Sequence, residues 1–142
     1  MTKINMSKIN NLIKDISKEY NIKCTFNDDN SKEYENNCYV IGRSEIIIGK
    51  YENEENKLIS FFHEIGHCLI EKEFIEKWKY NTLIIEIECW NIGIEEARKR
   101  NILFSDNAIK FGYEKALSYV GHDEREVYNY NETCKINLIM EN

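Results

Sequence analysis

The chain has 142 residues, of which 42% are hydrophobic and 31% charged, and its formal net charge is −6. This length suits one domain with its own core, and we expect 1–142 to form a single domain. The negative charge argues against nucleic acid as a partner, because phosphate binding needs clustered Lys and Arg. No apolar run reaches transmembrane length, so no membrane association is expected.

The cysteines and the first residues bear on the compartment. The five cysteines are an odd number and include no C-x-x-C pair, which predicts free or buried thiols in a reducing compartment. Residues 1–16 contain no continuous apolar stretch and no small-residue cleavage site, so no secretion signal is expected. We therefore expect a cytoplasmic location.

One helix and three short strands are predicted in the first third of the chain. Residues 5–20 repeat apolar side chains at helical spacing. Three β-type runs follow, separated by polar, turn-rich connections, at 22–26, 38–41 and 45–49. Residues 42–44, Gly-Arg-Ser, suit a tight hairpin between the last two runs. We expect the strand at 45–49 to offer an edge to an extended substrate.

A second helix is predicted over 57–70, which contains no Pro and has a strong helical period. Its apolar stripe consists of Leu58, Phe62, Ile65 and Leu69, with Phe61 beside it. His63 and His67 fall on roughly the opposite side, so core packing would not need them.

Residues 63–67 of this helix read H-E-I-G-H. Two imidazoles four positions apart lie on one helix face, about 6 Å apart along the axis, and can share a metal ion, most often Zn²⁺. His63 and His67 are therefore the expected ligands. Glu64 would lie beside the metal, where it could accept a proton from bound water as general base. The plain alternative is an amphipathic helix with two chance His, although they are two of only three in the chain.

A third helix, predicted over 82–100, offers two candidates for the third ligand. Glu86 shares a face with a mostly small stripe that would let another helix approach closely; its members are Cys89, Trp90, Gly93 and Ala97. Glu88 points nearly the other way. Because a ligand must face the partner helix, Glu86 is the expected ligand; the alternative is a surface carboxylate near a helix start.

A fourth helix is predicted over 105–120, with Ser105 or Asp106 as its cap and Gly121 ending it. The tail 122–142 gives no clear pattern, and 135–140 could be a short strand or the end of a packed helix. His122 lies directly after the terminating glycine.

With H-E-I-G-H followed by E-I-E-C-W at 86–90, the chain resembles the small gluzincin-type zinc metallopeptidases, and among them the ImmA/IrrE-like group and related phage-encoded proteins. The resemblance covers about 45–120. It implies an α+β, zincin-like (minimal gluzincin) domain with a small antiparallel sheet of about three strands and about four helices. It also implies Zn²⁺ held by His63, His67 and Glu86, with Glu64 as catalytic base.

Position 90 departs from that family pattern. Many gluzincins carry an Asp or Asn four residues after the ligand Glu, where it orients a ligand imidazole. Trp90 has only a donor and cannot accept an imidazole N–H, so Asn91 or a backbone carbonyl would have to serve.

The leading functional hypothesis is hydrolysis of a peptide bond in a specific protein or peptide substrate. Candidates for stabilising the oxyanion or donating a proton are His122, Tyr113, Tyr119 and Tyr128. A second hypothesis is a zinc-containing but non-proteolytic phage or mobile-element regulator that binds a host or repressor protein. A third is a metal-free helical interaction protein. The sequence leaves the substrate and the oligomeric state open.

Overall fold

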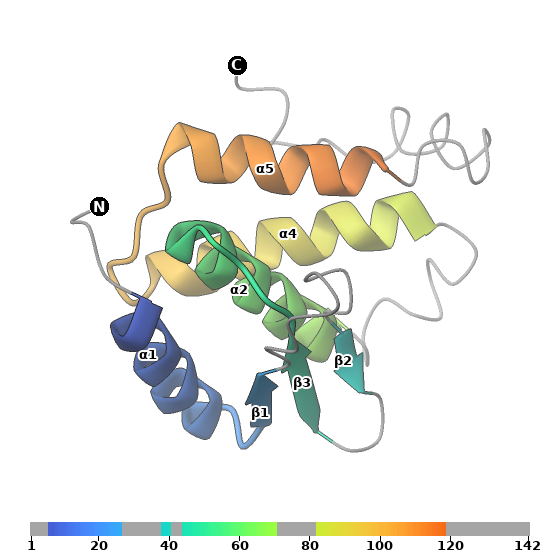
Figure 1. Cartoon of the computed structure of the whole chain (residues 1–142). Coiled ribbons are helices and arrows are strands. Elements are labelled where there is room, and N and C mark those ends of the chain that lie inside the picture. The colour runs from blue at the N-terminus through green and yellow to red at the C-terminus, as the bar shows by residue number, and fades with distance from the viewer. Residues whose placement is uncertain (1–5, 27–37, 41–43, 71–81, 119–142) are drawn as a thin grey trace.

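The computed structural model describes residues 6–26, 38–40, 44–70 and 82–118, and within these ranges it contains four helices and one three-stranded sheet, an α+β arrangement (Figure 1). The elements in chain order are α1 (Met6–Glu19), β1 (Lys23–Phe26), β2 (Cys38–Val40), β3 (Glu45–Ile48), α2 (Glu54–Ile70), α4 (Thr82–Arg98) and α5 (Asp106–Leu117). Each predicted helix and strand in these ranges is present, with ends that differ by a few residues.

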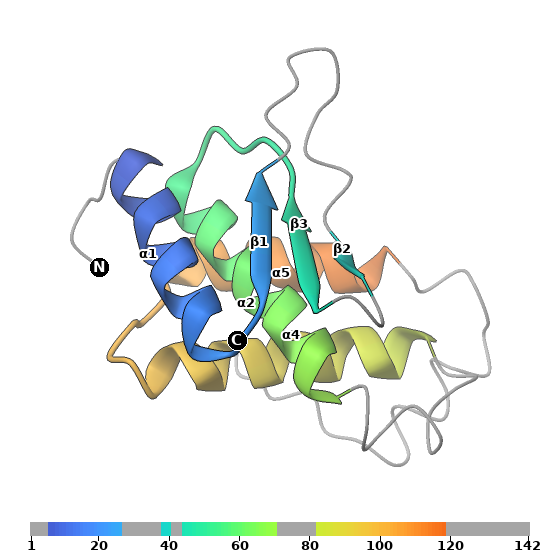
Figure 2. The same ribbon diagram turned by 90° about the horizontal axis from the view of Figure 1, so that it is seen from below.

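The sheet has the order β1-β3-β2, so β3 is its central strand (Figure 2). β3 pairs in parallel with β1, from Lys23 opposite Glu45 to Phe26 opposite Ile48, and antiparallel with β2. The expected antiparallel sheet is therefore mixed. Parallel neighbours need a long connection, and residues 27–44 supply one because they include β2 itself.

The central place of β3 also overturns the expectation that 45–49 offers an edge to a substrate. All four residues of β3 are paired with β1, and three of them are also paired with β2. A strand paired on both sides has no free row of backbone groups for a third chain.

Helix α2 runs through the middle of the molecule, with α1 and the sheet on one side and α4 and α5 on the other (Figure 1). Every residue from Lys57 to Gly66 is buried, as expected of a helix covered on both sides. Leu58, Phe62 and Ile65 are fully buried, which confirms most of the predicted stripe. Leu69 is 39% exposed, so it does not belong to the core.

Two glycines let α2 and α4 cross at very short range. A Cβ on Gly66 would lie 2.1 Å from the Cys89 carbonyl oxygen, and a Cβ on Gly93 would lie 2.3 Å from the Phe62 carbonyl oxygen. Both distances are far below contact distance, so neither position tolerates a side chain without movement of the backbones. The predicted close approach along the small-residue face of α4 is confirmed.

The N-terminus of α5 is hydrogen-bonded to the first turn of α2. Ser105 is the N-cap, since its Oγ accepts a hydrogen bond from the Ala108 N–H at 3.2 Å. The Glu55 carboxylate accepts hydrogen bonds from both the N–H and the hydroxyl of Ser105, at 2.7 and 2.6 Å. The predicted cap at Ser105 is confirmed, whereas the helix end predicted at Gly121 and the tail 122–142 lie outside the described residues.

Three cysteines have described side chains, and none of the three is in a disulfide, namely Cys24, Cys68 and Cys89. Within the described ranges, no helix combines the length and the apolar character needed to cross a membrane.

Candidate metal centre

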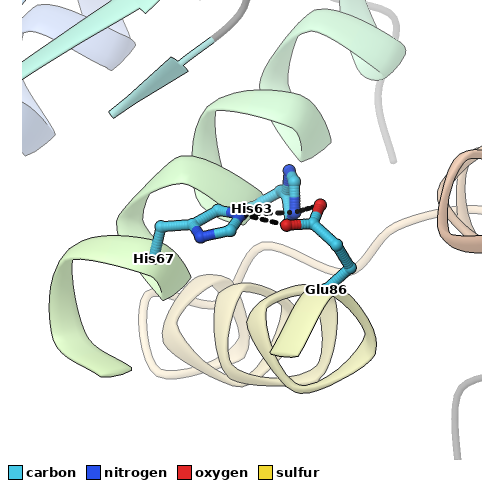
Figure 3. Close-up of side chains that lie close together, drawn as sticks. All are labelled: His63, His67 and Glu86. Atoms are coloured by element: carbon cyan, nitrogen blue, oxygen red, sulfur yellow. Dashed lines mark hydrogen bonds and ion pairs between the residues drawn. The ribbon is translucent and has the colours of Figure 1, made fainter. Parts of the chain in front are cut away.

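The two histidines of the H-E-x-x-H motif lie one turn apart on α2, and their rings converge (Figure 3). The Nε2 atoms of His63 and His67 are 3.2 Å apart. His63 is buried, at 8% exposure, whereas the His67 side chain keeps 25% of its surface exposed. The pair therefore extends from the buried interior at His63 to the partly exposed surface at His67.

Glu86 reaches the same point from α4 (Figure 3). Its Oε1 lies 3.1 Å from the Nε2 of His63, and its Oε2 lies 2.8 Å from the Nε2 of His67. The glycine crossing of α2 and α4 makes this reach possible, because it brings the two backbones together within a turn of Glu86. Glu88, the other candidate, is half-buried and is not part of this group.

His63, His67 and Glu86 form a group that could hold a metal ion, the one such cluster of three or more His, Cys, Asp or Glu found in the described part of the chain. Tetrahedral zinc with ligand bonds of about 2.0–2.1 Å places its ligands about 3.3 Å apart. The two Nε2 atoms are 3.2 Å apart, and each lies close to a different oxygen of Glu86, at 3.1 Å for His63 and 2.8 Å for His67. One donor atom from each of the three residues lies within 4.8 Å of the other two. The donor set thus suits a metal without refolding of either helix.

Glu64 contacts the opposite side of the His63 ring from the converging donors. Its Oε2 lies 3.1 Å from His63 Nδ1, and Glu64 is 5% exposed. A carboxylate at Nδ1 favours the tautomer with the proton on that nitrogen, which leaves the Nε2 lone pair free for a metal. Glu64 therefore supplies the imidazole partner that the sequence assigned to Asn91 or a backbone carbonyl.

The electrostatics of the group are those of histidines surrounded by buried carboxylates. Burial by itself lowers the pKa of His63, but the Glu64 and Glu86 carboxylates outweigh burial and raise this pKa to about 9. Burial by itself raises the pKa of Glu86, but its hydrogen bonds to His63 and His67 hold this pKa well below its usual range. In the metal-free protein, a proton on His63 thus supplies the positive charge that a bound cation would otherwise supply.

Trp90 covers one face of the His63 ring. The ring centroids are 4.0 Å apart and the planes differ by 6°, which is a parallel stack. The sequence placed Trp90 on the same face of α4 as Glu86, one turn later, so the signal for this contact was present. Trp90 was predicted to lie on the face where the two helices approach and to depart from the family pattern, but the stack on His63 was not predicted.

The other candidate polar groups are not assigned to the site. His122, Tyr119 and Tyr128 lie outside the described residues. Tyr113 is half-buried on α5 and makes no polar contact with the three donors in the described part of the chain.

Two imidazoles and one carboxylate form a donor set typical of catalytic zinc, in which three protein ligands leave one tetrahedral position open. Structural zinc sites are instead closed by four protein ligands. Comparison of the chain with known protein families, with curated proteins and with solved structures gave no match.

Proposed function

We propose that this chain is a zinc-dependent endopeptidase of the minimal gluzincin type, similar to the ImmA/IrrE-like group, and that it cleaves a specific protein partner. The observation that carries the proposal is the convergence of His63, His67 and Glu86 beside a buried Glu64. An amphipathic helix with two chance histidines would not require a buried carboxylate from a second helix at the same point.

The donor chemistry favours zinc among the common metals. Imidazole nitrogen suits zinc and its transition-metal neighbours, whereas calcium and magnesium prefer sites made only of oxygen ligands. Zinc bound by three protein donors would polarise a carbonyl and lower the pKa of water in the open position to about 7. The partly exposed His67 marks the side on which a substrate could approach.

The chain's own contribution to hydrolysis is proton transfer at the Glu64 carboxylate. Glu64 follows the first ligand directly, and Oε1, the carboxylate oxygen that does not contact His63, would accept a proton and deliver it to the leaving amine. Its contact with His63 Nδ1 would hold the imidazole in the tautomer that the metal site needs. Glu64 would thus serve both the ligand and the reaction.

Selectivity for a protein partner follows from the small size of the region about 45–120. A site bordered by two helices offers little material to enclose a loose peptide. Backbone hydrogen bonds contribute only about 1 kcal/mol each in net terms, so affinity for unstructured peptides would be poor. We expect negligible turnover of casein and cleavage only of a cognate protein that docks as a folded unit.

One observation favours the second candidate, a zinc-containing regulator that binds its partner without cleaving it. Glu64 Oε2 lies against Nδ1, on the far side of the ring from the Nε2 that faces the other donors. A carboxylate in that place can support a ligand without taking part in hydrolysis.

The variant Glu64→Gln separates the two candidates, because Gln can still accept a hydrogen bond from Nδ1 but is a far poorer acceptor of a proton. Cells that naturally carry the gene would produce either the parent chain or Glu64→Gln, and new protein N-termini would be identified by mass spectrometry. We expect a few new termini with the parent and none with the variant, at equal zinc content. The regulator is the correct function if the variant keeps the biological effect of the parent.

A further inference from the structure

We propose that Trp90 is a positioning residue that fixes the plane of the His63 imidazole, and that Gly112 on α5 determines where Trp90 lies. The inference rests on the metal binding proposed above. It extends the site to a third helix that contributes no metal ligand.

The contact between the two rings is close and enclosed. His63 and Trp90 stack at 4.0 Å with an interplanar angle of 6°, and they are 8% and 3% exposed. Nε1 of Trp90 is buried and has no hydrogen-bond partner among the described residues. Buried indole N–H groups usually find an acceptor. Because this one has none, ring contacts and not a hydrogen bond set the orientation of the Trp90 side chain.

Helix α5 supports the indole ring of Trp90. A Cβ built on Gly112 would lie 2.9 Å from Cε3 and 3.1 Å from Cζ3 of Trp90, closer than side-chain atoms pack. Phe111 meets the same indole edge-on, with ring centroids 6.5 Å apart at 85°. Trp90 therefore lies between the His63 ring and the backbone of α5, in a space that no residue other than glycine at position 112 would leave open.

The His63 ring is consequently restrained at both nitrogens and on one face. Glu64 lies at Nδ1 and Glu86 at Nε2, both 3.1 Å away, and these contacts restrain rotation of the ring. The indole covers one face of the ring and opposes tilting toward that face. Because Trp90 is neutral, it gives this support without adding a further negative charge to a cluster that already buries two carboxylates.

The test measures zinc affinity by competition with a chromophoric chelator, together with the visible spectrum of the Co²⁺-substituted protein. Trp90→Leu removes the stacking face but keeps an apolar side chain, whereas Trp90→Phe keeps an aromatic face. Phe104→Leu is the matched control, since Phe104 is a partly buried aromatic that packs edge-on against Phe62 at 6.1 Å. Gly112→Ala presses on the indole, and its control is Ala108→Gly, a buried change in the same helix.

Outer partners of metal-bound histidines are worth about 10–100-fold in affinity. We expect Trp90→Leu and Gly112→Ala to weaken zinc binding by at least about tenfold and to alter the Co²⁺ spectrum. Trp90→Phe, Phe104→Leu and Ala108→Gly should stay within about threefold of the parent. A folded Trp90→Leu protein with the parent's affinity and spectrum would show that Trp90 only fills space.

A metal-free measurement separates this inference from the proposed function. An indole stacked on an imidazole shifts the ring protons of that imidazole upfield in the NMR spectrum, and three His in the chain make assignment by substitution simple. We expect one His63 ring proton to be shifted upfield in the parent and to return to its ordinary position in Trp90→Leu. No such shift in the parent would refute the stack whatever the metal content, whereas a shifted resonance in a parent that binds no zinc would refute the metal site instead.

Discussion

On the side of α2 that faces α1 and the sheet, Leu58, Phe61 and Ile65 are fully buried among aliphatic and aromatic side chains. On the side that faces α4, the same helix buries His63 against Trp90 and brings Gly66 onto the backbone at Cys89. Burying a large apolar side chain contributes about 1.5–3 kcal/mol. A buried charged group destabilises the fold unless it is paired. The first face is therefore mainly apolar, whereas the second, which also buries Ile59 in an apolar cluster, carries polar groups that its neighbours must compensate.

The largest effect should come from removing a donor on the α4 side. His63→Ala or Glu86→Gln should weaken zinc binding by more than about 100-fold, since even outer partners of ligands are worth about 10–100-fold. Zinc content of the purified protein and competition with a chelator would measure this. Glu88→Gln is the matched control on the same helix, and it should bind about one Zn²⁺ per chain. Equal loss of zinc in Glu88→Gln would contradict the role of Glu86.

The opposite face should respond in stability alone. Phe61→Ala should lower the free energy of unfolding by about 3–5 kcal/mol, because it leaves a cavity in the core. Its zinc affinity, measured at a temperature where the variant is fully folded, should match that of the parent. Leu103→Ala is the control, since Leu103 is 64% exposed and its loss should change stability by no more than about 0.5 kcal/mol.

The close crossing of α2 and α4 at Gly66 and Gly93 should affect both zinc affinity and stability. Gly66→Ala forces a Cβ toward the Cys89 carbonyl oxygen, 2.1 Å away, so α2 and α4 must separate. We expect a loss of about 1–3 kcal/mol in unfolding free energy, as for other overpacked cores, together with weaker zinc binding because Glu86 moves with α4. Glu95→Ala, an exposed change on α4, should affect neither. Unchanged zinc affinity in a destabilised Gly66→Ala protein would show that the crossing does not position the ligand.

The smallest expected effect is the pH dependence that arises from the candidate metal ligands on the α4 side. In the metal-free protein the pKa of His63 is raised from 6.5 to about 9 by Glu64 and Glu86. A raised folded-state pKa means that the stabilisation is complete below about pH 6.5 and is lost as pH rises through about 9. Glu86, whose pKa is lowered, gives stabilisation that is present above its ordinary value of 4.5 and is lost as pH falls below it.

Melting temperatures in the presence of a chelator, taken from about pH 4 to 10, would measure the loss of stability at both acidic and alkaline pH. The loss of stability at alkaline pH should become smaller in His63→Gln, and what remains comes from the thiols of Cys24 and Cys89, whose pKa values are raised by burial. Zinc binding at pH 7 should also release about one proton from His63, measurable by calorimetry in buffers of different ionisation enthalpy. Zinc binding without proton release would show that His63 is already neutral in the metal-free protein.

The local part of the site could be predicted because a helix determines it. The spacing of His63 and His67 places both rings on one face whatever surrounds the helix. The choice of Glu86 over Glu88 needed only the helical angle and the presence of small residues on the same face. The cap at Ser105 likewise depended on residues next to it in the chain.

The long-range part could not be predicted from these patterns. The sequence of β3 suits a strand but does not say which strands lie beside it, and the central place of β3 depends on how residues 27–44 return to the sheet. The stripe on α2 indicated one buried face, whereas α4 and α5 bury the opposite face as well. Leu69 was assigned to the core by periodicity, although it is 39% exposed in the last turn of α2.

By itself, the sequence determined the helices, the spacing of the two His and the three residues that could hold a metal, because these depend on the period of a helix and on the chemistry of single residues. Only the tertiary structure decided the mixed sheet, the contact of Glu64 with Nδ1 of His63, and the stack of Trp90 between His63 and Gly112. Residues 63, 90 and 112 come from three different helices. Their distances depend on how the helices cross, which is the summed result of packing across the whole core and not a property of any one segment.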